Sequence, residues 1–176
     1  ATSADWFISP VGFAVALGSP IFARTYIFPW VETAPSAIAE SYLVQAQTTA
    51  GDAGMIGAIA IRYDTSGTAV ARLYRGGPVI VGSGLTCTEG QNQCDVPLSL
   101  GVHHRIDLKV VVSATVGIVE MRVDGTARAT YSGNTGTVLV YKWVFAGGTS
   151  APNANVYVVH DDMMVTDTAY APDGKT

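Results

Sequence analysis

The sequence has few charged residues. Asp, Glu, Lys and Arg make up 14% of the 176 residues, whereas about 25% is usual in a soluble domain. The mean hydropathy is positive. A surface with so few charges is often covered by a neighbouring subunit, a further domain or a particle. The alternative is a secreted β protein rich in Gly, Thr and Ser. The ten basic residues are spread thinly and the net charge is −4, so we expect no nucleic-acid partner.

The sequence also lacks an uninterrupted apolar run of the roughly 18–20 residues that a membrane-spanning helix needs. The nearest candidate, residues 6–30, is interrupted by three prolines and an arginine. No basic segment precedes it, so it does not resemble an intact signal peptide. We therefore expect no membrane partner. The chain begins at Ala1 instead of Met, which leaves processing or excision from a longer chain open.

Cysteine is scarce, with only Cys87 and Cys94 present. The residues between them include Gly90 and Asn92, which favour a turn, so two strand ends could bring the Cα atoms into disulfide range. A disulfide would indicate an oxidising compartment or an extracellular particle. Two free thiols are the alternative. A zinc site would need four ligands, and the adjacent residues 103 and 104, both His, would face opposite ways on a strand.

The sequence does contain short segments in which apolar and polar residues alternate, separated by turn signals about every 8–12 residues. In the clearest segment the apolar face is Ile106, Leu108, Val110 and Val112, and the polar face is Arg105, Asp107 and Lys109. This period of two predicts a strand with one side in the core and the other in solvent. A second alternating segment ends at Asp124–Gly125, the dipeptide typical of a type I′ hairpin turn.

These segments predict the fold class. Residues 55–63, MIGAIAIRY, are apolar on both faces, as in a central strand. Helix is nearly absent, although residues 35–42 could hold one or two turns. We predict an all-β fold: a jelly-roll β-sandwich of two antiparallel sheets with little helix. One domain would cover residues 1–176. Residues 1–20 would form either an extended arm that adds a strand to a neighbour or the first strands of the same sandwich.

Two adjacent aspartates, Asp161 and Asp162, lie between apolar runs near the C-terminus. They would fall in the middle of a strand or at a bulge, with one pointing inward and one outward. That is a poor geometry for a catalytic acid pair, and the inward carboxylate would need hydrogen bonds. Calcium is the alternative, but it takes about six to eight oxygens, and no Asp-rich loop is nearby in the sequence. We predict no catalytic, metal or cofactor-binding residues.

Three segments carry a family resemblance: His104–Val110, Gly117–Gly125 and Tyr157–Val165. Their order resembles the C-terminal half of concanavalin A-like lectin/glucanase (laminin G-like) jelly rolls, and is similar above all to those in structural proteins of tailed bacteriophages. The first half of the chain agrees with this family only in the regular succession of its predicted strands. Two departures are His103, where the family strand begins with Trp, and Val159–His160, where the family has a single aliphatic residue.

The resemblance implies a structural protein more than an enzyme. The superfamily's glucanases resemble one another in a Glu-x-Asp-x-x-Glu strand, and Glu120 has Arg122 where Asp would stand. A Gly-x-Ser-x-Gly elbow and a phosphate loop are also absent. We therefore expect no enzymatic activity. The expected function is that of a virion structural protein, a capsid-decorating or tail-associated module that contacts other virion proteins or copies of itself. Its expected location is the virion, or alternatively it is secreted.

The alternative function is a lectin-like module on a virus or cell surface that binds carbohydrate. Exposed aromatic residues that stack on sugar rings would be its sign, and Trp6, Trp30 and Trp143 are available. The apolar run around Trp143 also fits a core position, and Trp30, after a proline, could instead anchor a loop against the sheet.

Overall fold

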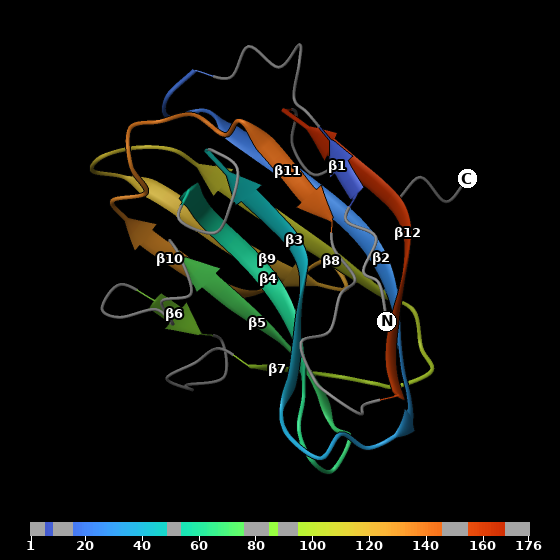
Figure 1. The fold of residues 1–176 in the computed structure, drawn as a ribbon. Coiled ribbons are helices and arrows are strands. Elements are labelled where there is room, and N and C mark those ends of the chain that lie inside the picture. The colour runs from blue at the N-terminus through green and yellow to red at the C-terminus, as the bar shows by residue number, and fades with distance from the viewer. Residues whose placement is uncertain are drawn as a thin grey trace.

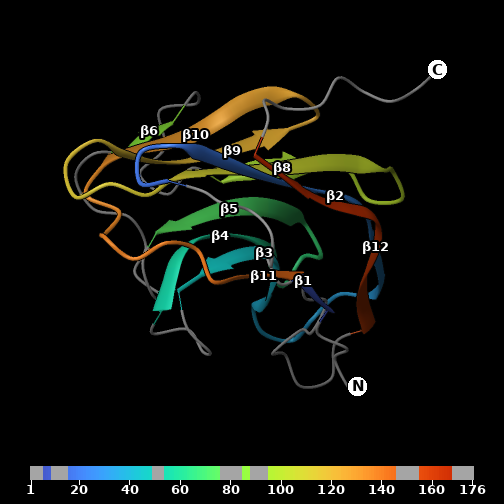
Figure 2. The same cartoon turned by 90° about the horizontal axis from the view of Figure 1, so that it is seen from above.

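Alternating side chains build two stacked antiparallel sheets. The computed structural model describes residues 6–8, 16–48, 54–75, 85–87, 95–145 and 155–167, and the strands within these ranges form two layers (Figure 1; Figure 2). Sheet A has the order β1 (Trp6–Ile8), β11 (Lys142–Phe145), β3 (Ala39–Gln47), β4 (Met55–Tyr63), β5 (Ala69–Arg75) and β7 (Val96–Leu98). Sheet B has the order β12 (Asn155–Thr166), β2 (Pro20–Thr33), β8 (His104–Val111), β9 (Gly117–Val123), β10 (Thr126–Gly133) and β6 (Leu85–Cys87). The predicted jelly-roll β-sandwich is confirmed.

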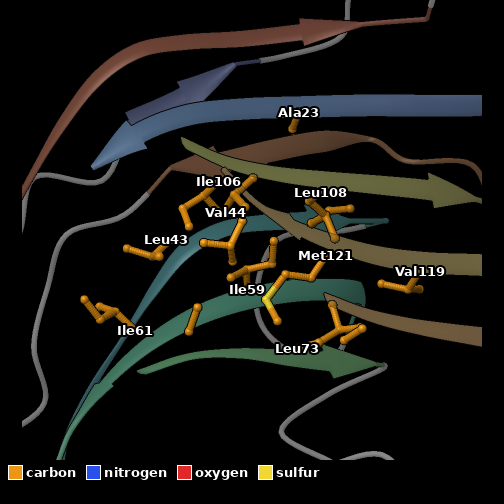
Figure 3. Close-up of a cluster of buried hydrophobic side chains, with 14 of the residues drawn as sticks. Ala23, Leu43, Val44, Ile59, Ile61, Leu73, Ile106, Leu108, Val119 and Met121 are labelled. Carbon is orange, nitrogen blue, oxygen red and sulfur yellow. The ribbon is translucent and has the colours of Figure 1, made fainter. Parts of the chain in front are cut away.

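The core lies between the two sheets and consists of every second residue of the inner strands. Ile59 and Ile61 of β4 face Ile106 and Leu108 of β8, and all four are fully buried (Figure 3). Burying each such side chain stabilises the fold by about 1.5–3 kcal/mol. Gly57 of β4 allows close approach of the sheets, because a Cβ there would lie 2.5 Å from a methyl carbon of Val119 in β9.

The predicted apolar face of β8 is confirmed, since Ile106, Leu108 and Val110 are fully buried. The prediction for its polar face is wrong in part, because Asp107 is also fully buried. Arg24 of β2 stands opposite Asp107 in the register, and its Nε lies 2.5 Å from Asp107 Oδ1. The Nε of Arg105 lies 3.0 Å from Asp107 Oδ2. The two long arginine side chains therefore pair with the carboxylate that the alternation predicted to be in solvent.

The predicted type I′ hairpin joins β9 to β10. Asp124 has φ 52° and Gly125 has φ 79°, so both central residues have the positive φ that this turn requires. Asp124 also closes the start of β8, because its carboxylate accepts hydrogen bonds from His104 Nδ1 at 2.8 Å and from the Arg105 amide at 2.8 Å. The other ring nitrogen, His104 Nε2, lies 3.0 Å from the Ser99 amide.

Two local predictions are wrong for reasons of strand pairing. Residues 35–42 contain no helical turn, because β3 begins at Ala39 and takes its backbone partners from β4. Near the C-terminus, the register of β12 shifts between Asp161 and Met164, and Asp162 has φ 47°. The bulge that we considered is confirmed. It leaves both aspartates exposed, so the expected inward carboxylate does not occur.

The N-terminal residues partly answer the question of the arm. Residues 6–8 form β1 and pair with β11 inside this chain's own sheet A, while residues 9–15 lie outside the described residues. Cys94 and the side chain of Cys87 also lie outside them, so the disulfide stays a prediction. Within the described ranges, no helix is long and apolar enough to cross a membrane.

Candidate functional site

Sheet A carries polar side chains on its outer face, the face turned away from sheet B. We call this the outer face of sheet A. The small cluster of Met55, Ala58, Ala60 and Tyr74, with Tyr42 packed against it, is separate from the main core. Around it lie the face's larger polar side chains, which are Glu40, Gln45, Gln47, Arg62, Arg72 and Asp95.

Two alanines of β4 make room for two tyrosine rings. Ala60 stands in register between Tyr42 of β3 and Arg72 of β5, and Ala58 stands beside Tyr74 of β5. Because these alanines are small, the rings of Tyr42 and Tyr74 meet edge to face above β4, with centroids 5.9 Å apart and planes at 77°. This is a favoured aromatic geometry, and it fixes the position of the Tyr74 hydroxyl.

The Tyr74 hydroxyl donates a hydrogen bond of 2.5 Å to Glu40 Oε1. Burial, and then the neighbouring Glu40 carboxylate, raise the pKa of Tyr74 well above its ordinary value. Both effects favour the neutral phenol. Tyr74 therefore keeps its proton at neutral pH and acts as a proton donor toward Glu40, which is itself partly exposed.

Arg72 connects this pair to Asp95, the residue before β7. The Arg72 Nε and Nη2 atoms lie 2.6 and 2.5 Å from the two carboxylate oxygens of Asp95, which is the bidentate arrangement that guanidinium favours. The hydrogen bond to Asp95 is the largest cause that raises the pKa of Arg72, and Tyr74 adds to it. A chain of interacting groups thus runs from Asp95 through Arg72 and Tyr74 to Glu40.

The glutamines of β3 add an unsatisfied acceptor. The Gln47 amide donates to Gln45 Oε1 at 2.6 Å, and both side chains are buried. The other end of the Gln47 amide, its Oε1 atom, is buried and has no hydrogen-bond partner among the residues that the structure describes. Buried polar atoms of this kind are rare in folded proteins because they cost free energy. A ligand hydroxyl that reached Gln47 Oε1 would remove that cost.

Among the described residues of this face, Arg62 is a cation without a salt bridge. Arg62 of β4 stands in register with Glu40 and is partly exposed. No salt bridge within the described part of the chain involves Arg62. Its guanidinium is therefore available to an anionic group of a ligand that lies near Glu40.

Sequence reasoning missed this face because its residues come from different strands. The signal was present as period-two pairs of a charged and an aromatic residue, Glu40 with Tyr42 and Arg72 with Tyr74. Each pair alone is typical of the solvent-facing side of a strand. Only the register of β3 and β5 on either side of the alanines of β4 brings the pairs together.

The residues singled out from the sequence lie elsewhere. Trp143 is a fully buried core residue. Trp30 lies in β2 rather than in a loop, is 50% exposed, and stacks with Phe28 at 6.4 Å. The side chain of Trp6 is outside the described residues. Among the residues that the structure describes, no three His, Cys, Asp or Glu side chains are grouped to hold a metal ion.

No protein-family model and no curated protein matches this sequence. Solved structures do match it. The fold is consistent with the concanavalin A-like jelly rolls. The alginate lyase Aly36B is 12% identical, with 86% of this chain and 70% of the lyase covered and a TM-score of 0.57. Scytalido-glutamic peptidase, solved with a peptide-based transition-state analogue, is 14% identical, with 93% of this chain and 79% of the peptidase covered and a TM-score of 0.55. A tetrameric galectin from the ball sponge Cinachyrella sp. is 12% identical, with 92% of this chain and 98% of the galectin covered and a TM-score of 0.48.

These neighbours correct the expected function. At such low identity they show the fold alone, and they provide no link to bacteriophage structural proteins. The prediction of a virion structural protein is contradicted, because the neighbours include alginate lyases. The prediction that the chain is not an enzyme is contradicted by the same alginate lyases. The alternative that we considered, carbohydrate binding, fits the neighbours better.

Proposed function

We propose that this protein binds a polysaccharide on the outer face of sheet A. One observation carries the proposal: hydrogen-bonded polar side chains cover a sheet face outside the main core, and beside them Gln47 Oε1 is a buried acceptor without a partner in the described part of the chain. Specific sites for small polar ligands combine a few fixed polar groups with apolar and aromatic surface. The network around Tyr74 and the rings above β4 supply both.

The fold neighbour supports a saccharide as the ligand class. A variant of the alginate lyase Aly36B, with a TM-score of 0.58 to this chain and 12% identity, was solved in complex with an alginate trisaccharide. Alginate is a chain of uronic acids, so a saccharide of this kind presents hydroxyls and carboxylates. Hydroxyls of a sugar can donate to Gln47 Oε1 and Glu40, and a carboxylate can accept from Arg62.

A second candidate function, cleavage of an acidic polysaccharide by β-elimination, is favoured by the short hydrogen bond between Tyr74 and Glu40. In this reaction Arg62 would bind the uronate carboxylate and Glu40 would remove the proton on the adjacent carbon. The electron pair of that C–H bond would form the new double bond as the C–O bond to the leaving sugar breaks. Tyr74 would protonate the leaving oxygen and then recover a proton from Glu40.

Binding is tested by calorimetry with alginate, a neutral β-glucan and a neutral galactan. We expect alginate to bind and Glu40→Ala together with Arg62→Ala to remove that binding. The matched control is Tyr157→Phe, which alters a half-exposed side chain on sheet B. If the double variant binds every saccharide as the wild type does, the outer face of sheet A is not the site.

Cleavage is tested separately by the ultraviolet absorbance of the unsaturated sugar that β-elimination produces. We expect Tyr74→Phe to lower turnover by about 10²–10⁴-fold, the usual contribution of a general acid or base, while alginate affinity changes little. Wild-type protein that binds alginate and yields no unsaturated product would exclude the lyase and leave the binding function in place.

A further inference from the structure

A pocket of about 260 Å³ lies between the end of β5 and the loop that follows β10. Thr48 and Gly54, at the adjoining ends of β3 and β4, also line it. Its described lining residues are Thr48, Gly54, Met55, Ile56, Arg75, Asn134, Thr135, Gly136, Thr137 and Val138. The volume is below the roughly 300–1,000 Å³ of sites for drug-sized ligands, so it suits one small molecule.

Arg75 gives this pocket a positively charged side chain. It is the one charged residue among the described lining residues, and no salt bridge in the described part of the chain involves it. Its guanidinium carbon lies 4.1 Å from the centroid of the Tyr131 ring. This cation–π contact holds the plane of the guanidinium and leaves its N–H groups able to donate to an anion.

The loop that forms the other wall is fixed in place before any ligand arrives. Thr135 Oγ1 donates to the Val111 carbonyl at 2.8 Å and accepts from the Ser113 amide at 2.9 Å. Gly117 makes this possible, because a Cβ there would overlap the Thr135 side chain. Tyr131 contributes as well, since its hydroxyl donates to the Asn134 carbonyl at 3.3 Å.

The same tyrosine therefore supports both walls: its ring holds Arg75 and its hydroxyl holds the loop. A site whose groups are already ordered loses less conformational entropy on binding. The lining residues also include Thr137, whose side chain carries a hydroxyl, and the apolar residues Met55 and Val138. A cation, a hydroxyl and an apolar patch in a small volume match a small organic acid that also carries hydroxyl groups.

We propose that the Arg75 pocket binds the carboxylate of a small hydroxylated organic acid of the size of a single uronic acid. The planar fork of arginine fits a carboxylate with two parallel hydrogen bonds. This binding needs none of Glu40, Arg62 or Tyr74, so it goes beyond the polysaccharide binding proposed for the outer face of sheet A and can be tested apart from it.

The test is titration calorimetry with three probes: D-glucuronate, D-glucose and inorganic phosphate. We expect D-glucuronate to bind the wild type and D-glucose not to bind. Loss of a hydrogen bond to a charged group makes Arg75→Gln bind D-glucuronate about 10- to 100-fold more weakly. The matched control is Arg122→Gln, on the outer face of sheet B, which should leave the affinity unchanged. D-glucose or phosphate that binds as tightly as D-glucuronate would overturn the ligand class.

A second variant keeps Arg75 intact. Val138 lines the pocket and is 59% exposed, so Val138→Trp should fold normally and fill the pocket from outside. We expect it to abolish D-glucuronate binding, with circular dichroism unchanged. Unchanged affinity in both Arg75→Gln and Val138→Trp would place the ligand elsewhere and end the proposal. The double variant of Glu40 and Arg62 should bind D-glucuronate normally, which separates the two sites.

Discussion

At the scale of single residues, Asp107 stands out because its carboxylate is fully buried. Isolated charges are very costly to bury, and Asp107 persists because Arg24 and Arg105 each contact a different carboxylate oxygen. A buried carboxylate that is paired in this way adds little net stability compared with an apolar side chain. Removing the Asp107 carboxylate is costly, because two guanidinium groups would then face each other without the anion between them.

We predict that Asp107→Asn lowers the free energy of unfolding by about 3–5 kcal/mol, the cost of breaking a buried ion pair from one side. Urea denaturation measures this change. The control is Glu120→Gln, which removes the carboxylate that pairs with the partly exposed Arg122 on the same sheet, and it should cost at most about 1 kcal/mol. Equal losses in the two variants would show that burial of Asp107 does not matter.

At the scale of elements, β4 and β5 are joined by a turn that adds hydrogen bonds of its own to those between the strands. The hairpin between β4 and β5 closes around Asp64, whose Oδ1 accepts from the Ser66 amide at 2.9 Å, the Ser66 hydroxyl at 2.6 Å and the Thr68 amide at 2.9 Å. The Ser66 hydroxyl and then the Thr68 amide lower the pKa of Asp64 below its ordinary value of 3.8. The turn is therefore stabilised by the ionised carboxylate.

This lowered pKa makes the turn sensitive to acid. Because the folded-state pKa is lower than the unfolded one, the stabilisation by Asp64 is present above the unfolded-state pKa of about 3.9. It is lost as the pH falls through the folded-state pKa. We predict that Asp64→Ala is less stable than the wild type at pH 7 and that the difference shrinks below about pH 4. Urea unfolding across pH measures it.

The control for this turn is Asp64→Asn, which keeps an acceptor oxygen and cannot ionise. The difference in stability between Asp64→Asn and Asp64→Ala should not change over the same pH range. A gap between wild type and Asp64→Ala that stays constant down to acid pH would contradict the role given to the charge.

The sequence predicted single strands and turns better than it predicted the candidate site. Residues 105–112 gave the apolar face of β8, and Asp124–Gly125 gave the turn, because both depend on local geometry alone. Residues 35–42 misled because Ala and Glu favour helix locally, while β3 owes its form to pairing with β4. The site around Tyr74 could not be predicted, since nothing local specifies which residues of β3 and β5 flank Ala58 and Ala60.

At the scale of the whole molecule, stability depends on how closely the two sheets pack. Gly57 of β4 and Val119 of β9 meet where the sheets face each other, and a Cβ at position 57 would lie 2.5 Å from Val119 Cγ1. Protein cores are packed about as densely as organic crystals. An added methyl group at this point has to displace the valine or separate the sheets.

We predict that Gly57→Ala lowers the free energy of unfolding by about 1–3 kcal/mol through overpacking, and that Val119→Ala alone also destabilises by leaving a cavity. The double variant should cost less than the sum of the two, because the new methyl group occupies space that the valine has vacated. A double-mutant cycle by urea denaturation measures this coupling. Additive losses would mean that the two sheets do not meet at these residues.

The bulge in β12 has a consequence for how molecules meet one another. This strand forms the rim of sheet B, where open backbone groups could template a strand from a second molecule. The shift of register after Asp161 and the left-handed backbone at Asp162 break the regular spacing of those groups, and the two exposed carboxylates add like charge. The aspartates that first suggested chemistry thus disfavour the pairing of a neighbour's strand with this rim.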